Sequence, residues 1–119
     1  MKPRGDRDYL QFINESLRLI EERLQGVTRD EFLASYLIHD AVGWRLFVIG
    51  QASADLSDNF RKAHAEIDWS LLIATCRQVV TDYRAFRVPE FWEAANVLLP
   101  PLRVRVPAWL LEFEQVSKL

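Results

Sequence analysis

This chain of 119 residues has one cysteine, no excess of positive charge and no long apolar run. The lone cysteine excludes an internal disulfide and fits a reducing cytoplasm. A formal net charge of -2 gives no overall attraction for nucleic acid, so contact with RNA needs a local basic patch. No stretch approaches the ~20 apolar residues that span a bilayer, and the first residues lack a secretion signal. We expect a cytoplasmic protein that binds neither membrane nor DNA.

The residue sets of most enzyme classes are also missing. The chain has no glycine-rich phosphate loop, no Ser-His-Asp set and no paired-carboxylate arrangement. Its two histidines, His39 and His64, stand apart in the sequence, and zinc normally needs three or four clustered ligands. We therefore expect no metal site and no cofactor, and a catalytic role for neither histidine.

Apolar residues recur at helical spacing throughout, and alternating strand patterns are almost absent. Gly26 is expected to end the first helix, because glycine adopts the left-handed conformation without steric cost. Thr28 and Glu31 form a capping box that opens a short second helix. Short connections make neighbouring helices antiparallel. The sequence predicts one all-α domain over residues 1–119, an up-and-down bundle of four main helices plus short helices. The apolar stripe of the first helix contains Tyr9, Phe12, Ile13, Leu17, Ile20 and Leu24.

Glycine and serine mark the middle of the chain. A third helix is predicted from Ile38 or Asp40 to about Leu56, and Gly50 lies inside it. Because glycine costs ~1 kcal/mol against alanine in a helix, this position predicts close packing against a neighbour. Ser57 then caps a short helical turn.

Proline marks the second half. A long helix is predicted from Trp69 to about Arg87, and Pro89 fits the first turn of the next helix. Pro100–Pro101 is expected to break the chain, because proline lacks the backbone donor. The last helix is predicted over about residues 101–118, with Pro107 near its start or at a kink.

Over about residues 9–102 the chain resembles the HepT-like family, within the HEPN group of all-helical domains. The resemblance implies a homodimeric, metal-independent endoribonuclease without a cofactor. It also implies a toxin that pairs with, and is neutralised by, a small nucleotidyltransferase of the MNT type. The segments that carry it, in order and at family spacing, are Tyr9-Leu10 with Ile20-Glu-Glu22, Gly26 with Glu31-Phe-Leu33, Asp40-Ala-Val42, Ile49-Gly-Gln-Ala52, Leu56-Ser57, Ile67 with Trp69, Tyr83 and Trp92.

The resemblance also implies a site at the dimer seam, made by an Arg, an Asn, a His and a Tyr. RNA cleavage by the 2′-hydroxyl needs a proton acceptor and donor near neutral pH, which suits His. It also needs a fixed cation on the phosphate, which suits Arg. Counting without gaps from Trp69 places Cys76 at the Arg slot, Arg77 at the Asn slot, Thr81 at the His slot and Tyr83 at the Tyr slot. The Thr81 hydroxyl cannot exchange a proton at neutral pH, so the acid/base role has no occupant.

A second alignment slides the pattern by one residue. Arg77 then takes the Arg slot and Asp82 the His slot. This shift needs a deletion inside a helix, which rotates later residues by ~100°. Since Trp69, Tyr83 and Trp92 agree with the ungapped count, we prefer the ungapped alignment. Two other slots also depart from the family: Gln51 stands where Glu is frequent, and Trp44 where a basic residue is common.

Arg77, Thr81 and Arg84 share one helix face. With Arg87, this face either contacts RNA phosphates or is simply solvated, and Asp82 beside it would repel phosphate. Cys76 lies on an apolar stripe, which favours a buried, inert thiol over a nucleophile.

Two further features of the sequence have two interpretations each. Tyr83 either packs through its ring or is modified by a partner enzyme, as the resemblance implies for some family pairs. The segment Tyr36-Leu-Ile38 and Trp44 either thicken the core or form an exposed interface patch for a second subunit or partner.

The replacement of the family's Arg and His by Cys76 and Thr81 favours a HepT-like protein with an impaired ribonuclease site. Such a protein acts by dimerisation and by binding an MNT-type nucleotidyltransferase. The first alternative is an active endoribonuclease. In it Arg77 and Arg84 hold the phosphate, while Asp82 or a second subunit's histidine moves the proton. That alternative would be recognised by His39 or His64 within hydrogen-bond reach of Thr81 across the seam. The second alternative is a helical interaction module with no nucleic-acid role, which predicts no RNA binding even at low salt.

Overall fold

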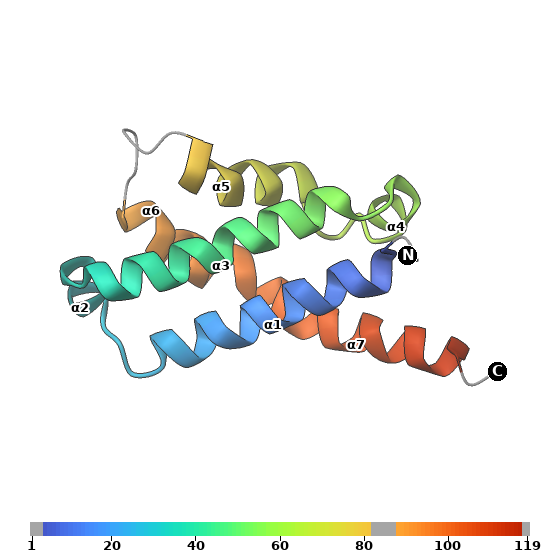
Figure 1. Cartoon of the computed structure of the whole chain (residues 1–119), viewed down its shortest axis with the longest axis horizontal. Coiled ribbons are helices and arrows are strands. Elements are labelled where there is room, and N and C mark those ends of the chain that lie inside the picture. The colour runs from blue at the N-terminus through green and yellow to red at the C-terminus, as the bar shows by residue number, and fades with distance from the viewer. Residues whose placement is uncertain (1–3, 82–87, 118–119) are drawn as a thin grey trace.

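Four long helices run alternately up and down along the molecule (Figure 1). The computed structural model describes residues 4–81 and 88–117, and these residues contain no strand. This confirms the predicted all-α, up-and-down bundle. The long helices are α1 (Asp6–Leu24), α3 (Tyr36–Asp55), α5 (Trp69–Thr81) and α7 (Leu99–Ser117), and the short ones are α2 (Arg29–Ala34), α4 (Asp58–Ala63) and α6 (Val88–Glu93).

Helix α3 is central, because α1 packs against one side of it and α5 against another (Figure 1). Helix α7 packs on α1. Each fully buried aliphatic side chain stabilises the fold by about 1.5–3 kcal/mol relative to an exposed one. Within the described residues, no helix is long and apolar enough to span a membrane. The innermost aliphatic side chains, at most 2% exposed, include Leu10, Ile13, Leu17, Ile20, Val42, Leu46, Ile49, Leu72, Leu102 and Val106.

The predicted helix ends at Gly26, Thr28 and Ser57 are confirmed. Gly26 has a φ of 73°, in the left-handed region that glycine adopts without strain. The Thr28 hydroxyl accepts the Glu31 N–H at 3.1 Å. The Ser57 hydroxyl accepts the Phe60 N–H at 3.1 Å and donates to the Asp6 carboxylate at 2.7 Å. This second bond ties the start of α1 to the start of α4.

Two helix boundaries were predicted wrongly. Helix α3 begins at Tyr36 rather than at Ile38 or Asp40, because the Ser35 hydroxyl caps it by accepting the Ile38 N–H at 3.3 Å. The chain also does not break at Pro100–Pro101: a π-helical segment, Ala94–Leu98, leads directly into α7.

Proline is tolerated there because the first turn of a helix leaves its N–H groups without partners in any case. The turn before it is widened, with the Leu99 N–H donating to the Ala94 carbonyl five residues back. Pro107 lies well inside α7, not near its start.

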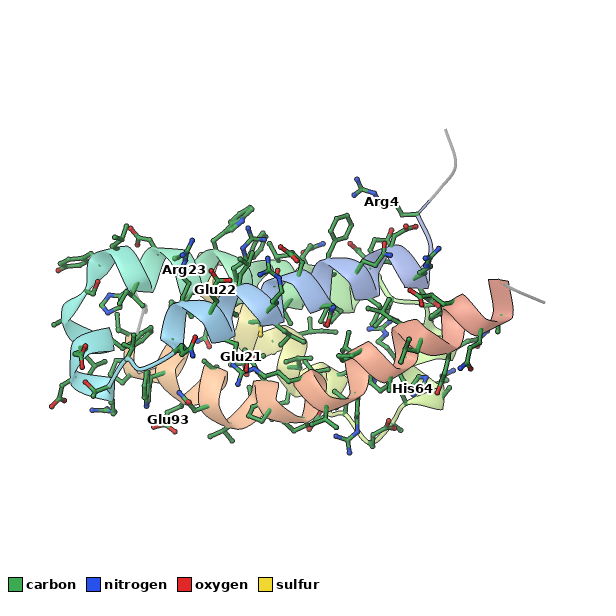
Figure 2. The ribbon with its side chains drawn as sticks, turned by 90° about the horizontal axis from the view of Figure 1, so that it is seen from below. Arg4, Glu21, Glu22, Arg23, His64 and Glu93 are labelled. Carbon is green, nitrogen blue, oxygen red and sulfur yellow. The ribbon has the colours of Figure 1, made fainter. Side chains whose placement is uncertain are left out.

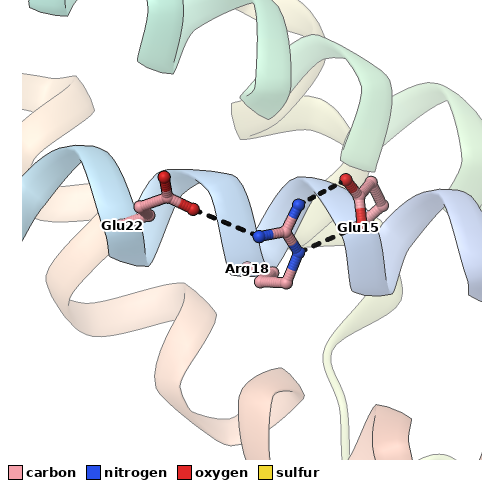
Figure 3. A network of polar contacts seen from close by, with 3 residues as sticks. All are labelled: Glu15, Arg18 and Glu22. Carbon is pink, nitrogen blue, oxygen red and sulfur yellow. Dashed lines mark hydrogen bonds and ion pairs between the residues drawn. The ribbon is translucent and has the colours of Figure 1, made fainter.

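The outward face of α1 is solvated and carries a small charge network (Figure 3). The Arg18 guanidinium donates to Glu15 at 2.7 Å and to Glu22 at 3.1 Å. The hydrogen bond from Arg18 lowers the pKa of Glu15, and the same bond raises the pKa of Arg18. Because all three side chains are exposed, the network contributes little to stability.

Candidate functional site

Helix α5 carries Cys76 and Arg77, which the ungapped alignment assigns to the first two positions of the family site, and Gly50 of α3 lies directly against them. An ideal Cβ on Gly50 would be 2.8 Å from the Cys76 Cβ, 3.0 Å from the Arg77 Cγ and 3.2 Å from the Arg77 nitrogen. Real Cβ atoms essentially never come as close as 2.8 Å to another atom, so only glycine allows α3 and α5 this spacing. The predicted close packing at Gly50 is confirmed, and its neighbours are the first two slots of the pattern.

Cys76 and Arg77 differ sharply in their surroundings although they are adjacent. The Cys76 side chain is 0% exposed, whereas Arg77 is exposed. Burial raises the pKa of the Cys76 thiol to about 12, so the thiol stays protonated at neutral pH. This confirms the prediction of a buried cysteine. An arginine at position 76 would place its guanidinium inside this packing, where an unpaired charge is costly.

The raised pKa predicts slow chemistry at this thiol. At pH 8, Ellman's reagent is expected to label the native chain only as fast as local opening exposes Cys76, because the thiolate is the reacting form. In denaturant the thiol should react immediately. Ala63→Cys, at an exposed position of α4, is the matched control and should react at once in the native state. Rapid stoichiometric labelling of the native wild type would contradict the buried placement.

The other predicted site residues are Thr81, the last described residue of α5, and residues that follow it in the sequence. Thr81 is the last residue of α5, one helical turn after Arg77, so the two positions share a face. The Thr81 side chain lies outside the part that the structure describes, as do Asp82, Tyr83, Arg84 and Arg87. The proposed roles of these residues in phosphate contact or modification stay predictions.

His39 serves the packing between α2 and α3. Its side chain is 4% exposed, and Nε2 donates to the Phe32 carbonyl. Its ring lies 5.0 Å from that of Phe32 and 5.8 Å from that of Tyr36, measured between centroids. The Nδ1 atom is buried and has no hydrogen-bond partner among the described residues.

His64 lies at the other end of α5 and beside α7 (Figure 2). Its ring is 4.3 Å from Trp109 and 4.4 Å from Phe60, and its carbonyl accepts the Trp69 indole N–H at 2.9 Å. Helix α5 has 13 residues and is therefore about 20 Å long, with His64 before its start and Thr81 at its end. Within one protomer His64 cannot reach Thr81.

An exposed apolar surface covers the outer side of α3. Tyr36 is 81% exposed, Leu37 82% and Trp44 56%, so this segment does not thicken the core. Ile38, between them, is half-buried and packs against the core. The aromatic ring of Phe47 lies 5.7 Å from that of Trp44 and enlarges the surface.

Phe12 of α1 was expected in the buried stripe of the first helix, but it is 41% exposed, with the Arg4 guanidinium 5.0 Å above its ring. Sequence reasoning missed Phe12 and Phe47 as surface residues. In the sequence, each of these two residues lies to one side of the buried apolar stripe of its helix, and this offset could have indicated their exposure.

Comparison with known proteins identifies the chain's relatives. A probable ribonuclease HepT from Thermococcus cleftensis is 29% identical over 84% of this chain and 91% of its own length. A protein of Caldanaerobacter subterraneus named "Putative RNase" is 24% identical over 84% of this chain and 89% of its own length.

A third relative, a "Gamma-glutamylcyclotransferase and putative RNase" of Methanocaldococcus jannaschii, is 31% identical over 82% of this chain, which spans 44% of that protein. No solved structure matches the chain significantly. The family model described as "Ribonuclease HepT-like" matches residues 13–108, nearly the whole helical bundle. The chain belongs to the HepT-like ribonuclease family.

Proposed function

We propose that this HepT-like chain acts by dimerisation and partner binding, and that its ribonuclease site is impaired. The observation that carries the proposal is the missing imidazole. The His slot holds Thr81 in the ungapped alignment and Asp82 in the shifted one. His39 and His64 are both engaged in aromatic packing. Without a group that exchanges protons near neutral pH, attack by the 2′-hydroxyl lacks general acid/base catalysis, which contributes about 100- to 10,000-fold.

The outer face of α3 supports the binding role. Tyr36, Leu37 and Trp44 expose large apolar side chains close together on one helix, and contiguous exposed apolar surface marks interaction sites. We propose that this face joins two copies of the chain into a homodimer. The second partner, in keeping with the family resemblance, is an MNT-type nucleotidyltransferase in a cytoplasmic toxin–antitoxin-like pair. Tyr83 is the proposed target of its modification.

A surviving ribonuclease is the second candidate, and the exposure of Arg77 favours it. An exposed guanidinium one turn before Thr81 is suitably placed to hold a phosphate, assisted by Arg84 and Arg87. The proton would then be moved by Asp82, or by a histidine of the second subunit. The homodimer would have to supply what a single protomer lacks.

The two candidates differ in their effect on RNA. Nuclease-free wild-type chain, incubated with labelled single-stranded RNA at low salt, is expected to leave the RNA intact. Weak binding that falls steeply with added salt would indicate phosphate contacts. Loss of this binding in the Arg77→Ala variant would indicate that the contacts lie at α5. Complete absence of binding at low salt would instead favour an interaction module without a nucleic-acid role.

The contrary result is RNA cleavage that Arg77→Ala abolishes. Arg23→Ala is the matched control, because Arg23 is an exposed arginine on α1 whose removal changes the net charge equally. Cleavage lost in Arg77→Ala and kept in Arg23→Ala would establish an active enzyme.

A further inference from the structure

Helix α7 presents apolar residues on two sides. One side is buried in the bundle and includes Leu102, Val106 and Trp109. The other side is exposed, with Val104 at 74% and Leu111 at 57%. Together with the preceding π-helical segment, this outer stripe consists of Val97, Pro101, Val104, Ala108 and Leu111, all of them exposed.

The spacing within the outer stripe is regular. Successive members are separated by four, three, four and three residues. From Pro101 to Leu111, all within α7, this alternation is the heptad spacing by which one helix packs against another along a seam. Single exposed apolar residues need no explanation, but a continuous row at seam spacing marks an interaction surface.

Charged residues beside the outer stripe indicate which helix covers it. Arg105 directly follows Val104, and Glu112 directly follows Leu111, so both lie on the same flank, one heptad apart. An antiparallel second copy of α7 would bring Arg105 next to its partner's Glu112, and the pair would form twice. A parallel copy would put these two charges on opposite sides of the seam, each facing a proline of the partner helix at position 100 or 107, and would form no charge pair. The stripe is therefore self-complementary in one orientation only.

We propose that two copies of this chain associate by packing α7 against α7 in antiparallel orientation through the outer stripe. Ala108 lies between the two flanking charges, near the two-fold axis, where its small side chain lets the helices approach closely. Arg105 makes two surface contacts, a weak pair with Glu66 at 3.7 Å from its Nε and a hydrogen bond from its Nη1 to the Pro101 carbonyl at 3.1 Å, and its side chain is 39% exposed, so exchange to a partner's carboxylate costs little.

This surface is separate from the α3 face of the proposed homodimer. Helix α1 packs against both α3 and α7 and lies between their outer faces (Figure 1). The new interface does not rest on the proposed function. Two different two-fold contacts on one chain would build assemblies larger than a dimer.

Light scattering after size-exclusion chromatography tests the interface. Val104→Asp is expected to halve the mass of the wild-type assembly. Val116→Asp, a substitution at a similarly exposed valine of α7 outside the stripe, should leave it unchanged. Both variants should keep the helical circular dichroism of the wild type, because both positions face solvent. A wild type that stays monomeric, or a Val104→Asp variant with the wild-type mass, would overturn the proposal.

Charge reversal tests the orientation. Glu112→Arg is expected to weaken association about tenfold or more by placing two cations together, and adding Arg105→Glu should restore it. Ala108→Cys should form a disulfide-linked dimer under mild oxidation, whereas Val116→Cys should not. Failure of both the rescue and the crosslink would exclude the antiparallel arrangement.

Separate substitutions distinguish the α3 contact from the α7 contact. Trp44→Asp removes the α3 contact and leaves α7 intact. If Trp44→Asp lowers the mass and Val104→Asp does not, the α3 homodimer stands and the α7 contact is refuted. The opposite pattern supports the α7 contact and refutes the α3 homodimer.

Discussion

Thr81→His is expected to raise RNA cleavage by this chain from background by about 100- to 10,000-fold, the range that a positioned proton carrier contributes. The expectation follows from helical geometry, because position 81 is one turn after Arg77 on the same face of α5. An imidazole there would stand beside an exposed guanidinium that can hold the phosphate. The measurement is the initial rate of cleavage of a labelled single-stranded RNA near pH 7.

The matched control is Asp82→His, which adds the same side chain one position along. A residue one step further on a helix is rotated by about 100°, so its imidazole should help less. If Asp82→His gains more than Thr81→His, the shifted alignment is the correct one. If neither variant cleaves RNA, the missing imidazole is not what impairs the site. The double variants that add Arg77→Ala to each of these changes should lose any gain.

Gly50→Val is expected to lower the free energy of unfolding by about 4 kcal/mol or more, a large part of the stability of a domain this size. Even the single Cβ of Gly50→Ala would lie 2.8 Å from the Cys76 Cβ, an atom that no side-chain rotation can move aside. For alanine, overpacking of about 1–3 kcal/mol is partly offset by a gain of ~1 kcal/mol in helix propensity. We expect a net loss of up to about 2 kcal/mol.

Urea denaturation followed by circular dichroism measures both losses. Gly5→Ala is the control, because a Cβ at Gly5 meets nothing within 4 Å, and the loss there, from replacing the N-cap glycine of α1, should stay below about 1 kcal/mol. A Gly50→Ala variant as stable as the wild type would show that α3 and α5 separate without cost. The same variant should alter the position of Arg77, since its Cγ would lie 3.0 Å from the new methyl group.

Local features of the fold were predictable from short sequence patterns. Gly26 and Thr28 mark helix ends through backbone conformation and side-chain hydrogen bonds that involve only near neighbours in sequence. Gly50 predicted close packing, because its cost within a helix needs an explanation. The resemblance to the family rested on scattered single letters, whose order and spacing held over nearly the whole chain.

Other features were predicted wrongly, because they depend on interactions that a short sequence pattern does not reveal. The start of α3 depended on whether Ser35 or a later residue caps the helix. The passage through Pro100–Pro101 depended on a widened turn before it, which a rule based on single residues does not foresee. Phe12 belongs to an apolar stripe by spacing, yet it stays 41% exposed because the neighbouring helices do not cover it fully.

The amino-acid sequence by itself determined the helical class and the family. These properties follow from residue type and spacing, which need no neighbour. Only the tertiary structure decided that Gly50 of α3 packs against Cys76 and Arg77, that both histidines are engaged in packing, and that α7 keeps an uncovered apolar stripe. Periodicity shows which residues share a helix face, but burial depends on which faces other helices cover, and that is settled by the packing of the whole bundle.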